Sequence, residues 1–388
     1  MTLLPQSADE GAARTQKTLS QARHMPAHFY TSPEIYEREK ERIFQKEWLC
    51  MGRVEELDQP GDYLTFRVAG EPVVVCKDAA GKLRAFSNVC RHRGTQVAFG
   101  ESDSGTPFGK GCERAFSCPY HGWTYDLEGQ LINAPHSKEM EGFDTADFGL
   151  VPLRVDTWAG FLFVNFDPDA RDLMDVLNEV DFPQTYKPYR YEDFRLASKF
   201  SFELDCNWKF VNENLTDIYH IAVLHVNTFG PWQPLESYEF RPVRGGYHGY
   251  FKGKTLAPNG DSLFGTIPWI SGKLAEGGYS SLLRPNVPWF PRHDFLCFMT
   301  VWPGESVDKT VGISYQLFPK QHFDLPDFQE KVQVYDDFLK EFLSEDILMI
   351  KSLQQGVSSK YFQPGPMSRF EVAIHSIVNY YLERLDAE

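Results

Sequence analysis

Two short strings, Cys90-Arg91-His92 and Cys118-Pro119-Tyr120-His121, constrain this chain more than any other feature. Each string pairs a thiolate donor with an imidazole donor, and 25 residues lie between His92 and Cys118. Two Cys and two His in this order suit a [2Fe–2S] centre in which the thiolates hold one iron and the imidazoles hold the other. Neutral imidazoles raise the reduction potential to roughly −150 to +300 mV, so such a cluster can receive electrons and pass them on. The competing interpretation is a structural zinc site, because Cys and His are also zinc ligands.

The residues that flank the two strings favour the iron–sulfur interpretation. Extended to Gly94 and to Trp123, the strings resemble the Rieske loops of ring-hydroxylating oxygenases. Respiratory Rieske proteins carry an extra Cys in each loop, where this chain has Thr95 and Tyr120, so the resemblance is to the oxygenase branch. The segment 101–116 is long for that family, and we interpret it as a surface insertion in which Cys112 is a spare thiol and not a ligand.

The composition argues against several other classes of function. The net charge of −15 argues against a nucleic-acid partner, since phosphate contacts need a basic surface. No apolar run approaches the roughly 20 residues of a membrane helix, and residues 1–21 lack the apolar core of a signal peptide. Seven Cys residues without disulfide-like spacing suit the reducing cytoplasm. Glycine-rich nucleotide-binding motifs are absent from the sequence, which implies that reducing equivalents come from a separate protein.

A second set of candidate metal ligands begins with His220 and His225. On a regular α-helix, a spacing of five residues splays two side chains by about 140°. Both side chains could therefore bind one metal only where the helix is locally interrupted, and such irregularities often mark functional sites. Two unrelated histidines, one buried and one exposed, are the alternative interpretation.

Asp346 is the third candidate ligand. The pattern over 328–355 predicts a long helix that ends at Gly356. Asp346 lies within the apolar stripe of this helix, whereas Glu345 rotates off it. A carboxylate in a core is costly unless a positive group meets it, and no Lys or Arg lies one turn away on the same face. Two His and one carboxylate, with open coordination positions, suit a non-haem Fe(II) that activates O₂. The other members of the stripe are Phe338, Leu339, Phe342, Ile350 and Leu353.

Over nearly its whole length the chain resembles the α subunits of Rieske non-haem iron oxygenases. The cluster strings, then Asn207-Trp208-Lys209, then Asp-x-x-His-x4-His, then Glu345-Asp346 occur in the order typical of that family. The resemblance implies that Asp217 bridges the two centres, with His220 of its own subunit and His121 of the next as partners. The implied cofactors are a [2Fe–2S] Rieske cluster on Cys90, His92, Cys118 and His121, and a mononuclear Fe(II) on His220, His225 and Asp346.

The resemblance also implies a fold and an assembly. The expected fold class is α+β: an all-β Rieske domain, then a helix-grip (START-like) catalytic domain with an antiparallel sheet and a long C-terminal helix. We predict an N-terminal arm and helix over 1–47, a Rieske domain over 48–166 and a catalytic domain over 167–388. The signal Thr31-Ser32-Pro33-Glu34 predicts the start of the first helix, which should run to about Trp48. The family brings its two centres together between subunits, so we expect a homotrimer or a multiple of it.

The implied activity is that of a terminal oxygenase. An NAD(P)H-dependent flavin or ferredoxin-type reductase would supply electrons, and O₂ would hydroxylate or oxidatively demethylate a small organic substrate. Choline- and betaine-type members read Glu-Asn-x-x-Glu-x-Tyr-His, a spacing that 213–220 shares, but Asp217 is more typical of aromatic-ring oxygenases. An aromatic acid is therefore the main expectation, and a quaternary ammonium compound is the alternative. The remote alternative is a Rieske electron carrier fused to a ligand-binding module, which would hold two irons per chain and not three.

The sequence does not decide between the two substrate classes, but it names residues of the second half that would. An inward-facing Arg would favour an aromatic carboxylate through bidentate pairing, and an aromatic cage would favour a quaternary ammonium group through cation–π attraction. The basic candidates are Arg244, Arg284 and Arg292, and the aromatic candidates are Phe229, Trp232, Tyr247, Trp269, Trp289, Phe298 and Trp302.

Overall fold

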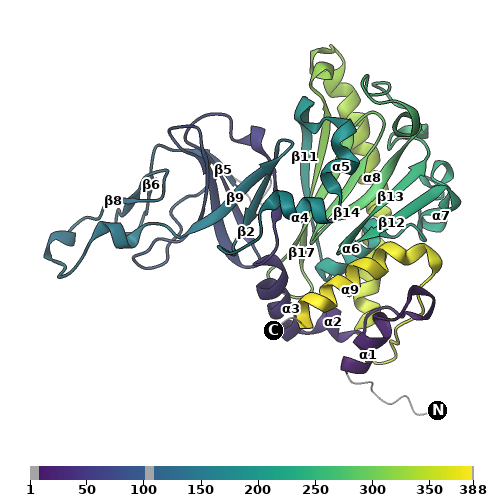
Figure 1. Cartoon of the computed structure of the whole chain (residues 1–388), viewed down its shortest axis with the longest axis horizontal. Helices are drawn as coiled ribbons and strands as arrows, with labels where there is room; N and C mark the ends of the chain where they lie inside the picture. Colours follow the sequence, from purple (N-terminus) through teal and green to yellow (C-terminus); the bar gives the residue numbers. More distant parts are fainter. Residues whose placement is uncertain (1–7, 101–108, 387–388) are drawn as a thin grey trace. The chain divides into compact units, whose positions relative to one another are not determined.

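The computed structural model describes residues 8–100 and 109–386, which form two compact units (Figure 1). One unit spans Phe44–Leu173, and the other combines the residues before Phe44 with those from Met174 onward. The first unit consists of strands and turns, and the second packs helices on a large sheet. This is the α+β class that the sequence predicts. Within the described ranges, every helix is too short or too polar to span a bilayer.

The Phe44–Leu173 unit contains two antiparallel sheets. Val73–Cys76 is completely buried because this segment lies inside the larger sheet, between two paired neighbours. The order of the larger sheet is β1 (Leu49–Arg53), β10 (Phe161–Asn165), β9 (Pro152–Trp158), β4 (Leu83–Ser87), β3 (Glu71–Lys77), β2 (Asp62–Val68) and β5 (Gly109–Cys112). The smaller sheet consists of β6 (Phe116–Ser117), β7 (Thr124–Tyr125) and β8 (Leu131–Asn133).

Two local predictions for this region need correction. The segment expected to be a surface insertion contributes the edge strand β5, which pairs with β2 so that Cys112 faces Asp62 in register; residues 101–108 lie outside the described ranges. Cys112 is exposed, as a spare thiol would be. The first long helix ends earlier than Trp48: α3 (Pro33–Glu39), capped by the Ser32 side chain, passes into a π-helical turn that ends at Phe44. Trp48 instead belongs to the Phe44–Leu173 unit, where its Nε1 donates to the carbonyl of Arg171 at 2.8 Å.

The second unit is built on one antiparallel sheet of seven strands. Its inner strand β16 is buried along its whole length, because both faces of the sheet are covered. Side chains alternate between these faces, so Cys297 and Met299 pack towards the longest helix, whereas Phe298 stacks on Tyr315 on the other side. The strand order is β11 (Phe194–Leu204), β17 (Thr310–Pro319), β16 (Leu296–Pro303), β15 (Val287–Pro291), β14 (Gly277–Leu283), β13 (Gly246–Lys252) and β12 (Tyr238–Val243).

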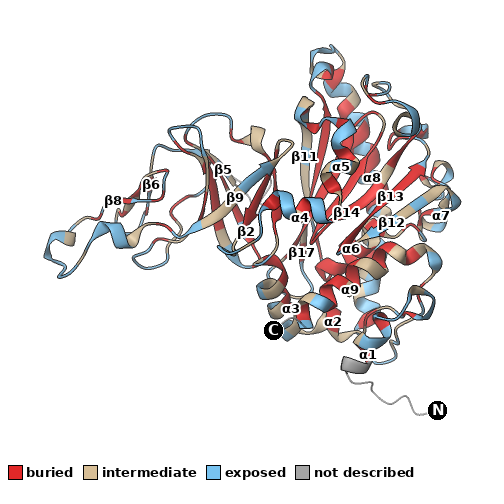
Figure 2. Ribbon diagram, viewed as in Figure 1, coloured by how far each residue is buried: buried red, intermediate tan, exposed pale blue. Residues whose placement is uncertain are grey.

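The longest helix, α8 (Phe328–Val357), lies over one face of this sheet (Figures 1 and 2). Its apolar stripe is buried as predicted as far as Ile350, but Leu353 is 48% exposed. The helix also continues through Gly356 and is capped at Ser358, so the predicted stop is slightly early. The remaining helices are α1 (Ala8–Thr15), α2 (His28–Thr31), α4 (Leu173–Glu179), α5 (Phe182–Tyr186), α6 (Trp208–Thr216), α7 (Ile221–Leu224) and α9 (Val372–Asp386).

Candidate active site

The two cluster strings lie in loops of the Phe44–Leu173 unit. The first loop follows β4, and the second connects β6 to β7. Both loops close in the same way. The amide of Gly94 donates to the backbone carbonyl of Cys90, and the amide of Gly122 donates to the backbone carbonyl of Cys118, each at 3.0 Å. Gly94 and Gly122 have φ values of +81° and +74°, in the left-handed region that glycine adopts most readily. The sequence thus builds two equivalent turns, each presenting one Cys and one His.

The four donors of these loops form two pairs. Nδ1 of His92 lies 3.1 Å from Nδ1 of His121, and both imidazoles are exposed. The Cys90 and Cys118 side chains are buried and contact each other, and burial together with the neighbouring Cys90 sulfur raises the pKa of Cys118. Two adjacent buried thiols ionise together only with a cation between them. The donors therefore fit a two-iron cluster with one iron on sulfur and one on nitrogen.

A single-ion zinc site does not fit the same loops. In the described part of the chain, three ligand atoms from His, Cys, Asp or Glu lie within 4.8 Å of one another only at His220, His225 and Asp346. The cluster loops thus lack the compact set of donors that one tetrahedral ion needs.

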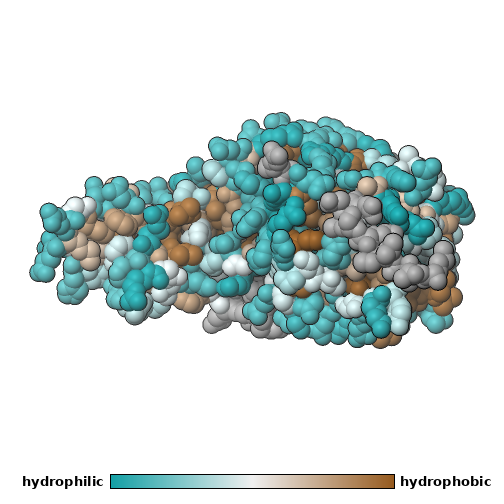
Figure 3. Space-filling view, turned by 90° about the horizontal axis from the view of Figure 1, so that it is seen from below, coloured by the Kyte–Doolittle hydropathy of each residue, from teal (hydrophilic) through white to brown (hydrophobic). Residues whose placement is uncertain are grey.

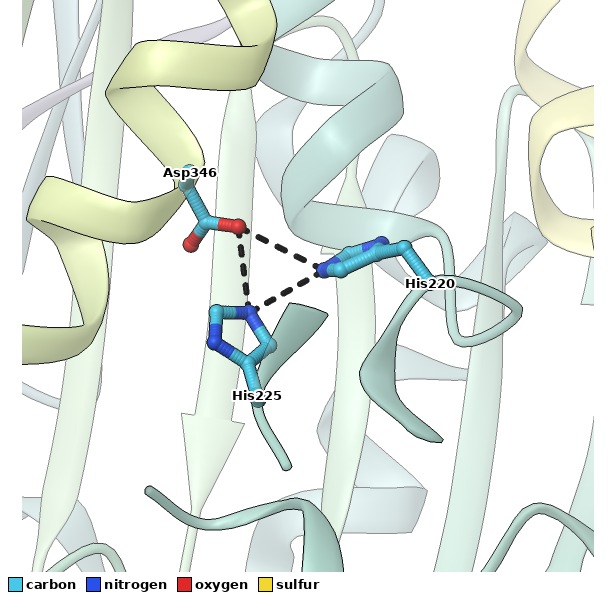
Figure 4. Close-up of side chains that lie close together, drawn as sticks. All are labelled: His220, His225 and Asp346. Atoms are coloured by element: carbon cyan, nitrogen blue, oxygen red, sulfur yellow. Dashed lines mark hydrogen bonds and ion pairs between the residues drawn. The ribbon is translucent and has the colours of Figure 1, made fainter. Parts of the chain in front are cut away.

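His220 and His225 flank a helix of a single turn. Helix α6 ends at Thr216, and Asp217 takes extended φ/ψ angles of −71° and 124°. His220 is then the N-cap of α7 and His225 its C-cap. This is the local interruption that their spacing of five residues requires, and it turns both imidazoles towards Asp346 on α8 (Figure 4).

The three side chains meet at their free ligand atoms. Nε2 of His220 and Nε2 of His225 are 3.2 Å apart, and Oδ1 of Asp346 lies 3.4 Å from the first and 3.1 Å from the second. Asp346 is 3% exposed, and its Oδ1 accepts no hydrogen bond from the residues described. A buried, unsatisfied carboxylate oxygen facing two imidazole nitrogens is the donor set of a divalent metal with open positions. These residues fit a mononuclear iron.

Asp217 holds the outer face of His220. Its Oδ2 lies 3.0 Å from Nδ1 of His220, and its Oδ1 accepts from the amide of Tyr219 at 2.7 Å. Burial lowers the pKa of His220, but the contacts with Asp217 and Asp346 outweigh burial and raise it to about 9. The carboxylate thus directs a proton to Nδ1 and leaves Nε2 to face Asp346.

Glu345 contacts the other histidine, which sequence reasoning missed. Its Oε2 lies 2.7 Å from Nδ1 of His225 and accepts a hydrogen bond from Oγ1 of Thr228 at 2.9 Å. Glu345 does lie off the apolar stripe, as predicted, but it reaches sideways to the ring of His225. In the sequence only the neighbouring Asp346 stood out as a candidate ligand. The signal that could have found Glu345 is its position beside Asp346, because an acid there can hydrogen-bond to the ring of a ligand histidine.

Comparison with known families agrees with this architecture. Residues 47–148 match the Rieske [2Fe-2S] domain, and 191–387 match the ring hydroxylating alpha subunit (catalytic domain). The chain belongs to the Rieske non-haem iron oxygenase α subunits. The family membership predicted from the motifs is confirmed, and so is the predicted class of activity, that of an oxygenase. The oxygenase uses a [2Fe–2S] cluster, a mononuclear iron, O₂ and electrons from a reductase.

Its relatives act on two kinds of substrate. The oxygenase is 30% identical over 343 residues to the carnitine monooxygenase oxygenase subunit of Acinetobacter pittii. This alignment covers 87% of this chain and 86% of that subunit. It is 32% identical over 269 residues to the biphenyl 2,3-dioxygenase subunit alpha of Rhodococcus jostii, covering 64% and 56%. A solved quaternary ammonium Rieske monooxygenase superposes with a TM-score of 0.79 at 26% identity, covering 98% of this chain and 99% of that one.

A cavity of about 510 Å³, its open mouth included, lies at the three-residue site. Of the seven predicted aromatic residues, only Phe229 lines it. Trp289 and Phe298 face each other across β15 and β16 on the opposite side of the sheet, because neighbouring strand residues alternate between faces. The lining consists of Asn214, Leu215, Asp217, His220, Ile221, His225, Phe229, Gln233, Tyr238, Leu256, Ser280, Phe290, Arg292, Cys297, Met299, Leu339, Phe342 and Asp346.

The three candidate arginines lie in different environments. Arg244 forms ion pairs with Glu179 and Glu383. Arg284 donates to the carbonyl of Arg244 at 2.9 Å and does not line the cavity. Arg292 does line the cavity, and it is 2% exposed.

Proposed function

We propose that this oxygenase hydroxylates a small quaternary ammonium compound at a methyl or methylene carbon next to the nitrogen, which leads to loss of an alkyl group. The observation that carries the proposal is the largely apolar cavity that His220, His225 and Asp346 line. Apolar and aromatic side chains form most of its wall, including Phe229 and Phe342. A trimethylammonium group suits such a wall, since it has no hydrogen to donate and is attracted by aromatic faces.

The proposal assigns a role to each of the predicted site residues. Cys90, His92, Cys118 and His121 hold the [2Fe–2S] cluster, and His220, His225 and Asp346 hold the mononuclear iron. These groups supply electron transfer and O₂ activation when they are bound. The protein's own part is to orient the imidazoles through Asp217 and Glu345 and to keep the substrate in a largely apolar cavity. An NAD(P)H-dependent flavin or ferredoxin-type reductase is the proposed electron donor.

The length of the similarity supports the quaternary ammonium class. The match to the carnitine monooxygenase subunit covers 87% of this chain, whereas the match to the biphenyl dioxygenase subunit covers 64%. Hydroxylation of an aromatic acid is the second candidate. The presence of Asp at position 217, where betaine-type members have Glu, favours that candidate, because Asp there is more typical of aromatic-ring oxygenases.

We propose a homotrimer, or a multiple of it, in which each Rieske unit serves the iron of a neighbouring subunit. Exposed apolar residues support contacts at both centres. Apolar residues are exposed on the cluster-bearing unit, at the left of Figure 3. In that unit Tyr120, the neighbour of His121 in the sequence, is 54% exposed. At the iron site, Tyr219 is 52% exposed and Val223 is 80% exposed. Two different patches that bind each other between copies generate a closed ring when the rotation between copies closes, as a threefold rotation does.

Asp217 has the position that a bridge between the centres needs. Its side chain retains 17% exposure while it contacts His220, so a carboxylate edge remains open to a neighbouring subunit. We propose that this edge accepts from the exposed His121 of the next subunit. All seven Cys thiols are free, and we place the enzyme in the reducing cytoplasm on that ground.

Substrate-dependent O₂ uptake tests the proposed function. The holoenzyme is supplied with NADH and a flavin–ferredoxin reductase and is offered trimethylammonium compounds, aromatic acids and aromatic hydrocarbons. We expect uptake with a trimethylammonium compound and release of formaldehyde or an aldehyde product that carries ¹⁸O from ¹⁸O₂ before exchange. The Asp346→Ala variant is the matched control, and it should retain the Rieske spectrum without uptake. Uptake driven only by aromatic acids or only by hydrocarbons would overturn the quaternary ammonium assignment.

A further inference from the structure

We propose that Arg292 and Gln233 bind a carboxylate of the substrate, so that the oxygenase acts on an organic anion or zwitterion. This inference deepens the proposed function and rests on it only in placing the substrate in the cavity at the iron site. Both residues line that cavity, and each is 2% exposed.

Arg292 is a buried cation without an acidic partner. Its Nη1 donates to the carbonyls of Tyr279 at 2.6 Å and Pro291 at 3.2 Å, but its Nε has no acceptor. No ion pair joins Arg292 to an acid within the described residues. A guanidinium stays charged in proteins, and burying a charge without a counter-ion is costly. An anion in the cavity would supply the counter-ion that Arg292 lacks among the described residues.

Gln233 adds a second donor to the same wall. Its Oε1 accepts from the hydroxyl of Tyr238 at 2.9 Å, and its Nε2 is buried without a partner. Tyr238 connects the two residues: burial raises the pKa of Tyr238, and Arg292 is the charge that opposes this rise. Arg292 Nε and Gln233 Nε2 are thus two buried donors without partners, on two residues that line the same cavity. Carboxylate oxygens, which accept several hydrogen bonds, satisfy such donors.

The competing explanation is that Arg292 is a structural cation. Its guanidinium carbon lies 4.7 Å from the centre of the Phe251 ring, and Asp294 acts on it electrostatically. The oxygens of Asp294, however, accept from the hydroxyls of Thr255 and Tyr335, and Asp294 does not line the cavity. These contacts leave the Nε of Arg292 without an acceptor.

The cavity wall carries charged side chains of both signs. Asp217 and the aromatic residues Phe229 and Phe342 lie with the two histidines, whereas Arg292 is an additional positive charge on the wall. A zwitterion with a quaternary ammonium group and a carboxylate matches both. An aromatic acid would satisfy Arg292 equally well, so the carboxylate is the feature shared by both candidate substrate classes.

Equilibrium binding to the holoenzyme tests the carboxylate site without turnover. The probes are glycine betaine, 4-(trimethylammonio)butyrate and benzoate, each compared with its primary amide by calorimetry under argon. We expect at least one carboxylate to bind tighter than its amide by about 30-fold or more, and Arg292→Met to abolish that difference. The Arg284→Met variant, which loses a buried guanidinium outside the cavity, should leave the difference unchanged.

Two further outcomes are decisive. If Arg292→Met does not fold, Gln233→Glu gives the same test, because the new carboxylate would occupy Arg292 and exclude an anionic ligand while sparing the amides. The proposal is overturned if carboxylates and amides bind the parent equally, or if a folded Arg292→Met or Gln233→Glu variant binds carboxylates as the parent does. O₂ uptake is measured in parallel. Uptake with uncharged substrates alone refutes the carboxylate site and retains the oxygenase, whereas Arg292-dependent binding without uptake refutes the proposed function alone.

Discussion

Replacing Glu345 by Ala should weaken metal binding at His225, although Glu345 is not one of the three proposed ligands. Its carboxylate lies 2.7 Å from Nδ1 of His225, a residue whose side chain is 1% exposed. This contact holds the proton on Nδ1 and keeps the lone pair of Nε2 free. Without Glu345, the proton can move to Nε2, which lies 3.1 Å from Oδ1 of Asp346, and the metal must then displace it.

The expected loss follows from the strength of that contact. A hydrogen bond to a charged group contributes about 1.5–3 kcal/mol, which corresponds to roughly 10- to 150-fold in a dissociation constant. Loss of a carboxylate that orients a metal-bound His typically costs about 10- to 100-fold in metal affinity. Both arguments predict that Glu345→Ala binds metal about 10- to 100-fold more weakly than the parent. Glu345→Gln should fall between the two, because a neutral amide oxygen can still accept the hydrogen bond.

The assay is competition for Co(II) between a chelator of known affinity and protein that retains its Rieske cluster but lacks the mononuclear metal. Glu341→Ala is the matched control, since Glu341 is an exposed acid one turn earlier on α8. It should bind Co(II) as the parent does. A dissociation constant for Glu345→Ala within twofold of the parent's would refute the orienting role of Glu345.

Three other perturbations have defined outcomes. Asp217→Asn should retain both metal centres, yet single-turnover oxidation of its Rieske cluster should slow by orders of magnitude; unchanged oxidation would remove Asp217 as the bridge. Cys90→Ser should lose the Rieske absorption bands while the catalytic unit stays folded by circular dichroism, and a normal rhombic spectrum would contradict its role as a ligand. Burial raises the pKa of Glu213 from 4.5 to about 7, so stability conferred by its neutral form is present below pH 4.5 and is lost as the pH rises through 7. At about 1.4 kcal/mol per pH unit, the loss in free energy of unfolding amounts to about 3 kcal/mol. Glu213→Gln should therefore unfold at a higher temperature than the parent at pH 8 but not at pH 5. The same difference in unfolding temperature at both pH values would contradict the raised pKa of Glu213.

The periodicity of the long helix and the short metal-binding motifs could be identified from the sequence alone. The cluster strings carry their own turn glycines, Gly94 and Gly122, so each loop is locally encoded. The stripe on α8 located Asp346 because a buried carboxylate breaks an otherwise apolar helical face. The five-residue spacing of His220 and His225 likewise indicated an interrupted helix, and the structure contains that interruption.

Strand residues were predicted less well, because the face to which a side chain points depends on register. Trp289, Phe298 and Trp302 read as cavity aromatics, but they lie one residue out of phase with Phe290, Cys297 and Met299, which do line the cavity. A shift of one residue moves a side chain to the other face of a sheet, and only the pairing of the seven strands fixes that choice. The position of β5 at the edge of its sheet depends on pairing in the same way.

By itself, the sequence determined which residue types can hold metals and where the regular helical face is interrupted, because both signals lie within a few turns of chain. The tertiary structure alone decided which distant side chains complete the site. Glu345 was assigned to His225, and Arg292 rather than Arg244 or Arg284 was placed in the cavity wall. His225 and Glu345 lie 120 residues apart in the sequence, and the packing of α8 brings them together. Arg292 directly follows β15, so the pairing of that strand sets its place.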